Sequence, residues 1–380
     1  MEFTPSEGEV AVARVAREFA EREMRPAVMK HDESQEFPAA IVHRLGELGF
    51  MGMTWPEDLG GSALSDLEAV AVIEELARVD PSVALTVASH NSLCSGHIMM
   101  FASDAQKRQY IPGLASGRTL GAWGLTEPGS GSDSGGMKTR ARRSGQEWVL
   151  NGSKTFITQG SVAGVYVIMA VTAPDAGKKG ISAFILPAGL EGFTIGKKEN
   201  KLGMRSSDTA TLLFDDVRLP ADALIGGEGE GFRQALAVLD GGRIGIAALS
   251  VGIARGALEA SVDYAKQRSQ FGSPLAEFQA IQWKLADMAT EVAAARLLTQ
   301  RAAWLKSRGE PYAVAASTAK YFASEAAVRA ANEGVQIHGG YGFIKEFPVE
   351  KLYRDVKLMT IGEGTSEVQK MIIARHVLQG

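Results

Sequence analysis

The spacing of hydrophobic and polar residues divides the chain into three parts. From residue 5 to 118, apolar residues recur at helical spacing among Ala, Glu and Arg, and prolines and a glycine pair interrupt the pattern. This spacing predicts a bundle of about five helices. Asp80-Pro81 and Ser103-Asp104 each supply a capping side chain followed by a first-turn proline or acid, so we expect a helix to begin at each pair.

The pattern changes twice after residue 119. Between about 120 and 225, short β-branched or aromatic runs alternate with Gly, Pro, Asn and Asp, which predicts a β-domain. Helical spacing then returns, with one apolar face marked by Ile246, Leu249, Ile253, Ala257 and Tyr264. The predicted fold class is α+β, mainly α, in three domains: an N-terminal helical bundle (1–119), a middle β-domain of barrel or sandwich type (120–228) and a C-terminal four-helix bundle (229–380).

The composition is that of an ordinary globular protein. The chain has 380 residues, of which 45% are hydrophobic and 22% charged, enough for a large core in two or three packed parts. The formal charge is −4 and no long run of like charge occurs, so we expect no nucleic-acid partner. The short cluster Arg140, Arg142 and Arg143 is interpreted as a solvated strand or turn face.

Cysteine and histidine usage argues against several classes of enzyme. The single Cys94 excludes an intramolecular disulfide and a multi-thiolate zinc site, and a buried filler is favoured over a catalytic thiol. The six histidines form no close ligand cluster, so no metal site is expected, and His90 and His97 are interpreted as structural. A G-x-S-x-G elbow is also missing from the sequence, which disfavours a serine hydrolase.

The start of the sequence and its apolar runs bear on location. The first residues show no basic segment followed by an apolar core, and the longest apolar runs are shorter than a membrane span. We therefore expect a cytoplasmic protein without membrane insertion, or a mitochondrial-matrix protein if this is a eukaryotic mature form.

Residues 124–136, GLTEPGSGSDSGG, form the densest cluster of turn residues. Such a loop can present backbone N–H groups and hydroxyls to an anion, although a Gly/Ser loop alone is more often an ordinary connector. It is not a dinucleotide fingerprint, because Ser134 stands where the third glycine belongs. Residues 152–155 resemble a P-loop but lack glycine directly before the lysine, and GGEGEGF (226–232) is interpreted as a hinge into the next helix.

The segment IGEGTSEVQK (361–370) places one carboxylate, Glu363, between two glycines and before a predicted helix. For an isolated G-E-G sequence, a solvent-exposed loop glutamate is the ordinary interpretation. Other segments of the chain, considered together with this one, favour a different interpretation.

Five stretches together resemble the acyl-CoA dehydrogenase family, and the likeness covers nearly the whole chain. They are GLTEPGSGSD (124–133), KTFIT (154–158), the segment from Arg268 to Gln279, QIHGGYGFIKEFPVEKLYRD (336–355) and GEGTSE (362–367). The resemblance implies a homotetramer whose subunits hold FAD non-covalently between the β-domain and the C-terminal helices, with a neighbouring subunit completing each site.

The resemblance also implies which residues contact FAD. Thr126 and Thr158 would hydrogen-bond the isoalloxazine edge, and Phe156 would lie against the ring where many relatives carry tryptophan. The full implied set is Trp123, Leu125, Thr126, Gly131, Ser132, Phe156, Ile157, Thr158, Arg268, Gln270, Phe271, Phe278, Gln279, Gln336, Gly339, Gly340, Thr365 and Glu367. Of these, Arg268, Phe271 and Gln279 would come from the neighbouring subunit.

For some of these residues the sequence leaves another interpretation open. Phe156 is equally explained as a buried strand aromatic. Arg268, the implied partner of the pyrophosphate, is otherwise a surface cation, and Gln336 is otherwise a polar residue at a helix end.

By the same resemblance, Glu363 is the base that removes the α-proton of an acyl-CoA while the β-hydrogen leaves as hydride to FAD. Two donors would stabilise the thioester oxygen, the backbone N–H of Glu363 and a ribityl hydroxyl of FAD, with Gly362 and Gly364 allowing the tight turn. Burial should raise the pKa of this carboxylate toward neutrality. Relatives that place the base elsewhere carry it where this chain has Gly242, which has no side chain.

Substrate contacts implied in this way are Ser132, Asp240, Arg243 and Gly364. Asp240 and Arg243 are equally interpreted as a helix cap and an ion pair. The stretch SHNSLCSGH (89–97) is most similar to the short-chain branch of the family, with branched or medium acyl chains left open. The resemblance implies an electron-transferring flavoprotein as partner; the alternatives are an oxidase or monooxygenase on the same fold, or a flavin-free helical scaffold.

Overall fold

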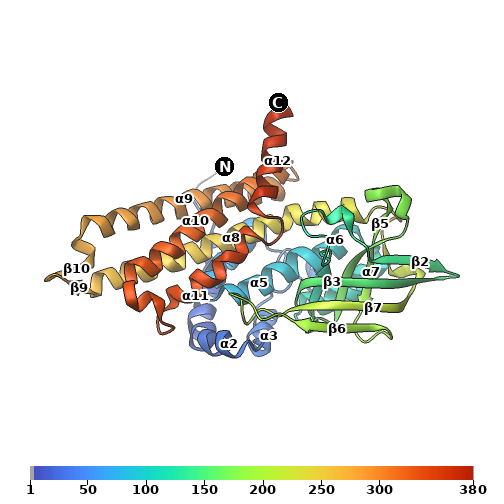
Figure 1. Cartoon of the computed structure of the whole chain (residues 1–380), viewed down its shortest axis with the longest axis horizontal. Helices are drawn as coiled ribbons and strands as arrows, with labels where there is room; N and C mark the ends of the chain where they lie inside the picture. Colours follow the sequence, from blue (N-terminus) through green and yellow to red (C-terminus); the bar gives the residue numbers. More distant parts are fainter. Residues whose placement is uncertain (1–3, 380) are drawn as a thin grey trace.

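The computed structural model describes residues 4–379 (Figure 1). The N-terminal α-helices are α1 (Glu7–Phe19), α2 (Val28–Ser34), α3 (Ala39–Glu47), α4 (Asp66–Val79), α5 (Pro81–Ser89), α6 (Gly96–Phe101) and α7 (Asp104–Ala115). The π-helical turn η4 (His90–Ser95) joins α5 to α6, and η1 (Ala20–Met24) and η2 (Arg25–Ala27) join α1 to α2. These elements form five continuous helical stretches, as the spacing predicts.

Both predicted helix starts are confirmed by their hydrogen bonds. The Asp80 side chain accepts a hydrogen bond from the Ser82 backbone N–H at 3.0 Å, and Pro81 is the first residue of α5. Ser103 caps α7 by accepting from the Gln106 N–H at 3.3 Å, while the Gln106 side chain accepts from the Ser103 N–H. Such reciprocal caps satisfy N–H groups that the helix itself leaves unpaired.

The middle part of the chain forms a β-sheet with the strand order β6-β7-β3-β2-β4-β5-β8, and β1 pairs in parallel with β4. The strands are β1 (Gly121–Gly124), β2 (Arg140–Ser144), β3 (Glu147–Thr158), β4 (Val165–Val171), β5 (Ile181–Pro187), β6 (Phe193–Lys198), β7 (Thr209–Pro220) and β8 (Leu224–Ile225). Successive β4 residues point to opposite faces. Val165, Val167 and Met169 pack with α6 and α7, whereas Tyr166 and Ile168 pack with β3 and β7.

The C-terminal part is helical again. Its elements are α8 (Gly231–Gln267), β9 (Ser269–Gln270), β10 (Ser273–Pro274), α9 (Gln279–Ser307), α10 (Ala313–His338), α11 (Pro348–Asp355) and α12 (Ser366–Gln379). One hydrophobic core includes residues of α4, α8, α9 and α10, so the two helical parts are packed as one body. Figure 1 shows α12 projecting from this body and the β9–β10 hairpin at the end opposite the sheet. The predicted fold class is confirmed, while the domain boundaries at 119/120 and 228/229 stay a prediction.

Among the described residues, α8 alone is long and apolar enough to cross a membrane, and 72% of its apolar window is buried inside the protein.

A buried ionic cluster ties the three parts together. The Lys351 ammonium on α11 lies 2.9 Å from Asp80 and 2.5 Å from Asp355, and the Asp355 carboxylate accepts the Met204 N–H from the loop before β7. All three ionic side chains are nearly inaccessible to water. Because a buried charge is tolerated only when paired, this cluster fixes the relative positions of α5, α11 and the β-domain.

The residues that the sequence assigns to structural roles are buried. His90 contacts the Leu114 carbonyl at 3.0 Å and accepts the Gly121 N–H, while His97 bridges Gln234 and the Trp123 indole. Burial lowers the pKa of both imidazoles to about 4, so they are neutral. Cys94 is buried, and between residues 4 and 379 no group of three His, Cys, Asp or Glu side chains is placed to hold a metal ion.

Candidate active site

Glu363 lies in a strained turn between two helices. The 3₁₀ helix η10 (Val356–Thr360) ends just before it, and Thr365 caps α12 by accepting the Val368 N–H at 3.4 Å. Glu363 has φ 54° and Gly364 has φ 96°, so both occupy the left-handed region. The expected left-handed glycine is present at Gly364. The other left-handed residue is the glutamate itself, which costs about 1–3 kcal/mol of strain.

The Glu363 carboxylate points inward against α8. Its Oε2 atom is buried and has no hydrogen-bond partner in the described structure. A Cβ atom on Gly242 of α8 would overlap with this carboxylate, so only glycine at 242 leaves it room. The interpretation of Glu363 as a solvent-exposed loop residue is therefore wrong.

Burial and two cations set the ionisation of Glu363. Burial raises the pKa of this carboxyl to about 7, against the opposing effects of the Arg243 guanidinium and the Lys320 ammonium. Near neutral pH the group therefore exchanges readily between its protonated and ionised forms. A carboxylate with this pKa is a far stronger base than a solvated glutamate.

Asp240 and Arg243 form an ion pair beside this carboxylate, with Arg243 Nη1 2.5 Å from Asp240 Oδ1. Both lie inside α8, which begins at Gly231, so the helix-cap alternative is wrong and the ion pair is confirmed. Arg243 is buried, its Nε has no hydrogen-bond partner in the part of the chain that the structure describes, and burial lowers its pKa. Glu363, Arg243 and Asp240 thus form one polar group around Gly242.

A buried ion pair holds the loop after β1. Lys154 on β3 is fully buried, and its Nζ atom lies 2.7 Å from Glu127 and 3.1 Å from the Leu125 carbonyl. Glu127 also accepts the backbone N–H groups of Lys138 and Thr139. The two stretches that the resemblance assigns to the flavin, 124–133 and 154–158, are therefore fixed to each other.

Phe156 occupies an irregularity of β3. The pairing of β3 with β7 shifts register between Lys154 and Ile157, and Phe156 has φ 57° with 65% of its surface exposed. A bulge of this kind redirects a side chain out of the sheet. The interpretation of Phe156 as a buried strand aromatic is wrong, and its ring is free to lie against a ligand.

Three residues of the implied cofactor set are buried in the protein core. Trp123 and Leu125 belong to the core between the sheet and the helices, and Ile157 to the core on the other face. Their side chains are therefore occupied by packing, and only their backbones are left for a cofactor. Thr126 and Thr158 are partly exposed, and Gly131 and Ser132 are exposed.

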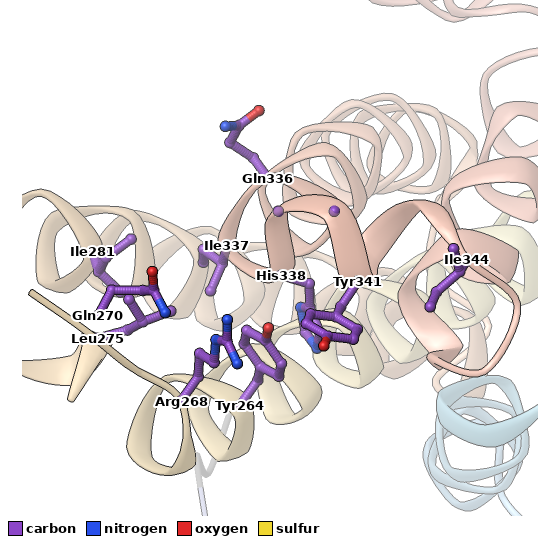
Figure 2. Close-up of a pocket in the computed structure, with 12 residues that line it drawn as sticks. Tyr264, Arg268, Gln270, Leu275, Ile281, Gln336, Ile337, His338, Tyr341 and Ile344 are labelled. Atoms are coloured by element: carbon purple, nitrogen blue, oxygen red, sulfur yellow. The ribbon is translucent and has the colours of Figure 1, made fainter.

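Five further residues of the implied cofactor set line a cavity of about 560 Å³ at the C-terminal ends of α8 and α10 (Figure 2). Its lining includes Arg268, Gln270, Gln336, Gly339 and Gly340. Aromatic side chains form part of the lining. The Tyr264 and His338 rings stack with centroids 4.2 Å apart, and the Arg268 guanidinium lies 5.3 Å from the centre of the Tyr341 ring.

Several side chains around this cavity face solvent. Arg268 is exposed, as expected for a surface cation, and Gln336 lies in the last turn of α10, as expected for a polar residue at a helix end. In Figure 2 the Gln336 side chain points away from Arg268. Gln270 and Gln279 are exposed, Phe278 is half-buried, and Phe271 is 97% exposed with φ 52°. A fully exposed phenylalanine in a strained conformation is unusual unless something covers it.

The carboxylate and the cavity lie far apart in one chain. Gly242, against the Glu363 carboxylate, and Arg268, at the cavity, are separated along α8 by 26 residues, about 39 Å at 1.5 Å per residue. The carboxylate and the cavity are therefore two separate places in one chain.

Comparison with known proteins decides the family. Three family models cover almost the whole chain: the acyl-CoA dehydrogenase N-terminal domain over residues 6–118, the middle domain over 122–217 and the C-terminal domain over 229–378. The chain belongs to the acyl-CoA dehydrogenase family.

Individual members of the family are similar over the full length. An acyl-CoA dehydrogenase of Bacillus subtilis is 48% identical over 98% of both chains, and a short-chain specific acyl-CoA dehydrogenase of Clostridium acetobutylicum is 44% identical over 100% of both. Two solved structures each match over 100% of both chains with 43% identity. They are the butyryl-CoA dehydrogenase of Megasphaera elsdenii, with a TM-score of 0.98, and a structure described as the electron transferring flavoprotein of Acidaminococcus fermentans, with a TM-score of 0.99.

The acyl-CoA dehydrogenase residues described above fit a flavin dinucleotide. Nothing lies within 4 Å of a Cβ placed on Gly129, Gly131, Gly339 or Gly340, so both loops are open to close approach by a ligand. Phe156 offers an exposed ring, and Arg268 a guanidinium of the kind that pairs with pyrophosphate.

Sequence reasoning missed two lysines of the site. Lys154 and Lys320 have no exposed surface. Lys154 forms a hydrogen bond to the loop after β1, and Lys320 forms one to the turn at Glu363. Lys154 was part of the KTFIT motif, but no pattern indicated that its ammonium was buried. For Lys320 a weak signal exists, since its helical neighbours Ala316 and Ala323 predict a buried face.

Proposed function

We propose that this member of the family is an FAD-dependent dehydrogenase that converts a short-chain acyl-CoA to the trans-2-enoyl-CoA, with Glu363 as the base. The observation that carries the proposal is the carboxylate of the half-buried Glu363: its Oε2 atom is buried without a partner among the described residues, and burial raises its pKa to about 7. Such a group is prepared to accept a proton from a carbon acid in a water-poor site.

Glu363 removes the proton from the carbon next to the thioester carbonyl and holds it on its carboxyl group. The backbone N–H of Glu363 donates to the thioester oxygen, which spreads the negative charge that develops as the proton leaves. Bound FAD supplies the acceptor for the hydride that leaves the β-carbon. The left-handed turn at 363–364 directs side chain and N–H toward one substrate.

The polar residues around the turn orient the acyl-CoA. We assign Asp240, Arg243, Ser132 and Gly364 to contacts with its pantetheine and thioester portion. The Asp240–Arg243 ion pair supports this role, because it holds two polar side chains next to the base without neutralising it. The Arg243 charge also favours the ionised base.

FAD is held by groups from two chains in this proposal. The loop 124–133, with Phe156 and Thr158, meets the isoalloxazine end, and Thr365 and Glu367 lie by the base. Arg268, Gln270, Phe271, Phe278 and Gln279 with Gln336, Gly339 and Gly340 serve the nucleotide of a neighbouring subunit. The separation of about 39 Å along α8 supports this division between two chains. The homotetramer is proposed from the family resemblance.

The relatives support the substrate class and the partner. Short-chain specificity follows the Clostridium acetobutylicum and Megasphaera elsdenii proteins, whose names refer to short-chain and butyryl-CoA dehydrogenases. An electron-transferring flavoprotein is the proposed electron acceptor, as the Acidaminococcus fermentans structure suggests by its description.

The proposal is tested by titrating the purified protein anaerobically with saturated acyl-CoAs of four to twelve carbons while recording flavin absorbance. We expect bleaching at the lowest concentrations with the four-carbon substrate, and release of the 2-enoyl product. Peroxide formation under air at the rate of turnover would identify an oxidase instead. A colourless protein that contains no FAD would contradict the proposal outright.

A further inference from the structure

Lys320 is a lysine inside the Ala-rich helix α10. It has no exposed surface, and neither have Ala316, Ala319 and Ala323 around it. Lysine is almost never fully buried unless a specific partner compensates the loss of water. The partner of Lys320 is therefore informative.

The Lys320 ammonium reaches the catalytic turn. Its Nζ atom donates to the Gly364 carbonyl at 2.7 Å, and within residues 4–379 this is its only hydrogen bond. Gln369 of α12, also fully buried, donates to the same carbonyl at 2.9 Å. The carbonyl of the residue next to the base is thus held by one charged and one neutral donor.

Several charged groups surround this turn. Glu363 has the strongest electrostatic effect on Lys320, whose pKa burial lowers to about 8. The other charged groups that act on Glu363 or Lys320 are Arg243 from α8, Glu325 from α10 and Glu367 from α12. Asp240 acts in turn on Arg243, and Lys357 and Lys370 act on Glu367. Glu325 accepts a hydrogen bond from the Ser366 hydroxyl, and Arg243 is paired with Asp240. Lys320 forms no hydrogen bond to a carboxylate in the described part of the chain, and of the carboxylates that act on its charge Glu363 has the largest effect.

We propose that Lys320 is a positioning residue for the Glu363 base: it holds the Gly364 carbonyl, and with it the turn that places the carboxylate over Gly242, while its positive charge favours the ionised carboxylate. The inference rests on the proposed function, because it assigns Lys320 to the same site. Two effects are combined in one side chain, a geometric one shared with Gln369 and an electrostatic one that Gln369 lacks.

Comparing Lys320→Met with Gln369→Leu separates these two effects. Each variant removes one donor to the Gly364 carbonyl and keeps a side chain of similar size, but only the first removes a charge. Gln369→Leu also removes the 3.4 Å bond to the Glu363 carbonyl. We expect both to lower kcat for a four-carbon acyl-CoA with little change in KM. In the pH profile of kcat/KM, the acidic limb should move to higher pH by about one unit in Lys320→Met and stay in place in Gln369→Leu.

Lys320→Gln, which keeps a polar group without the charge, should show the same displaced limb if the methionine variant does not fold. A folded, FAD-containing Lys320 variant with an unmoved limb would overturn the inference. Failure of both Lys320 variants to fold would overturn it too, since Lys320 would then belong to the packing of α10. A wild-type protein that does not turn over any acyl-CoA is a different result, which contradicts the proposed function itself.

Discussion

A Cβ atom on Gly242 would overlap with Oε2 of Glu363 and would lie 2.9 Å from its carboxyl carbon. Gly242→Ala should therefore displace the carboxylate, which is the movable end of a side chain, and leave the helix intact. A displacement of about 1 Å lowers a catalytic rate by about 10²-fold, so we expect kcat to fall by that order with FAD content unchanged. Steady-state turnover and the flavin spectrum measure both quantities.

Gly245→Ala is the matched control. It lies three residues along α8, where an added Cβ would make ordinary contacts at 3.6 Å with Ala88 and 3.9 Å with Ile73. Both substitutions gain helix propensity, up to about 1 kcal/mol, so stability should change little in either. Equal activity of the two variants would show that Gly242 does not make room for the base.

The pKa of about 7 at Glu363 predicts a pH dependence of turnover. In the proposed reaction the ionised carboxylate is the base, so kcat/KM should fall tenfold per pH unit as the pH drops below about 7 and level off above it. Glu363→Gln should keep FAD and lose flavin bleaching by at least 10²–10⁴-fold. A profile for the wild-type protein that stays flat down to pH 5 would contradict this assignment.

The raised pKa of Glu363 also predicts that the stability of the protein depends on pH. The pKa of Glu363 in the folded protein lies above the ordinary value of 4.5, so folding favours the protonated carboxyl group. Its contribution to the free energy of unfolding is therefore complete below pH 4.5 and is lost as the pH rises through about 7. Glu363→Gln removes the buried charge, so the variant should be more stable than the wild type at pH 8, by at most about 3 kcal/mol. The difference should vanish near pH 4.5. Thermal unfolding of both FAD-bound proteins at the two pH values tests this sign.

The order of helices and strands could be predicted because it depends on local spacing. Period-two and helical patterns, and capping pairs such as Ser103-Asp104, are written in consecutive residues. Glu363 could be proposed as the base, and expected to be buried, only through the resemblance of the G-E-G-T stretch. The contact that buries its carboxylate could not be predicted, because α8 lies more than one hundred residues away in the sequence.

Backbone strain was likewise hidden from the sequence. Phe156, Phe271 and Glu363 all have positive φ, although non-glycine residues rarely do. At Phe156 the cause is a register shift between β3 and β7, a property of the pairing and not of the KTFIT motif. The buried charges of Lys154 and Lys320 also depend on partners from distant segments, which no local pattern reveals.

Lys154→Met should destabilise the protein and weaken FAD binding together. It leaves the Glu127 carboxylate buried opposite an apolar side chain, and breaking a buried pair in this way costs about 3–5 kcal/mol. The loop after β1 also loses the bond from Lys154 to the Leu125 carbonyl. Thermal unfolding and FAD content after gel filtration measure the two effects.

The double variant Lys154→Met/Glu127→Gln provides the control for charge. It removes the uncompensated carboxylate and keeps one oxygen, which can accept the Lys138 or the Thr139 N–H, since these two groups bind different oxygens of Glu127. We expect it to recover part of the lost stability relative to Lys154→Met alone. A double variant that is less stable than the single one would show that the pair is not coupled through charge.

Arg268→Ala should weaken FAD retention and tetramer stability together if the cavity at the end of α8 serves a neighbouring subunit. The exposed guanidinium is the charge-assisted partner proposed for the pyrophosphate, and loss of such a bond is worth about 1.5–3 kcal/mol, or roughly 10- to 100-fold in the dissociation constant for FAD. Lys266→Ala removes a cation two residues earlier, at the exposed end of the same helix, and should leave both properties unchanged. Sedimentation velocity with absorbance at the flavin wavelength follows oligomer and cofactor at once, and an Arg268→Ala protein that stays fully loaded and tetrameric on dilution would show that this cavity does not hold the nucleotide.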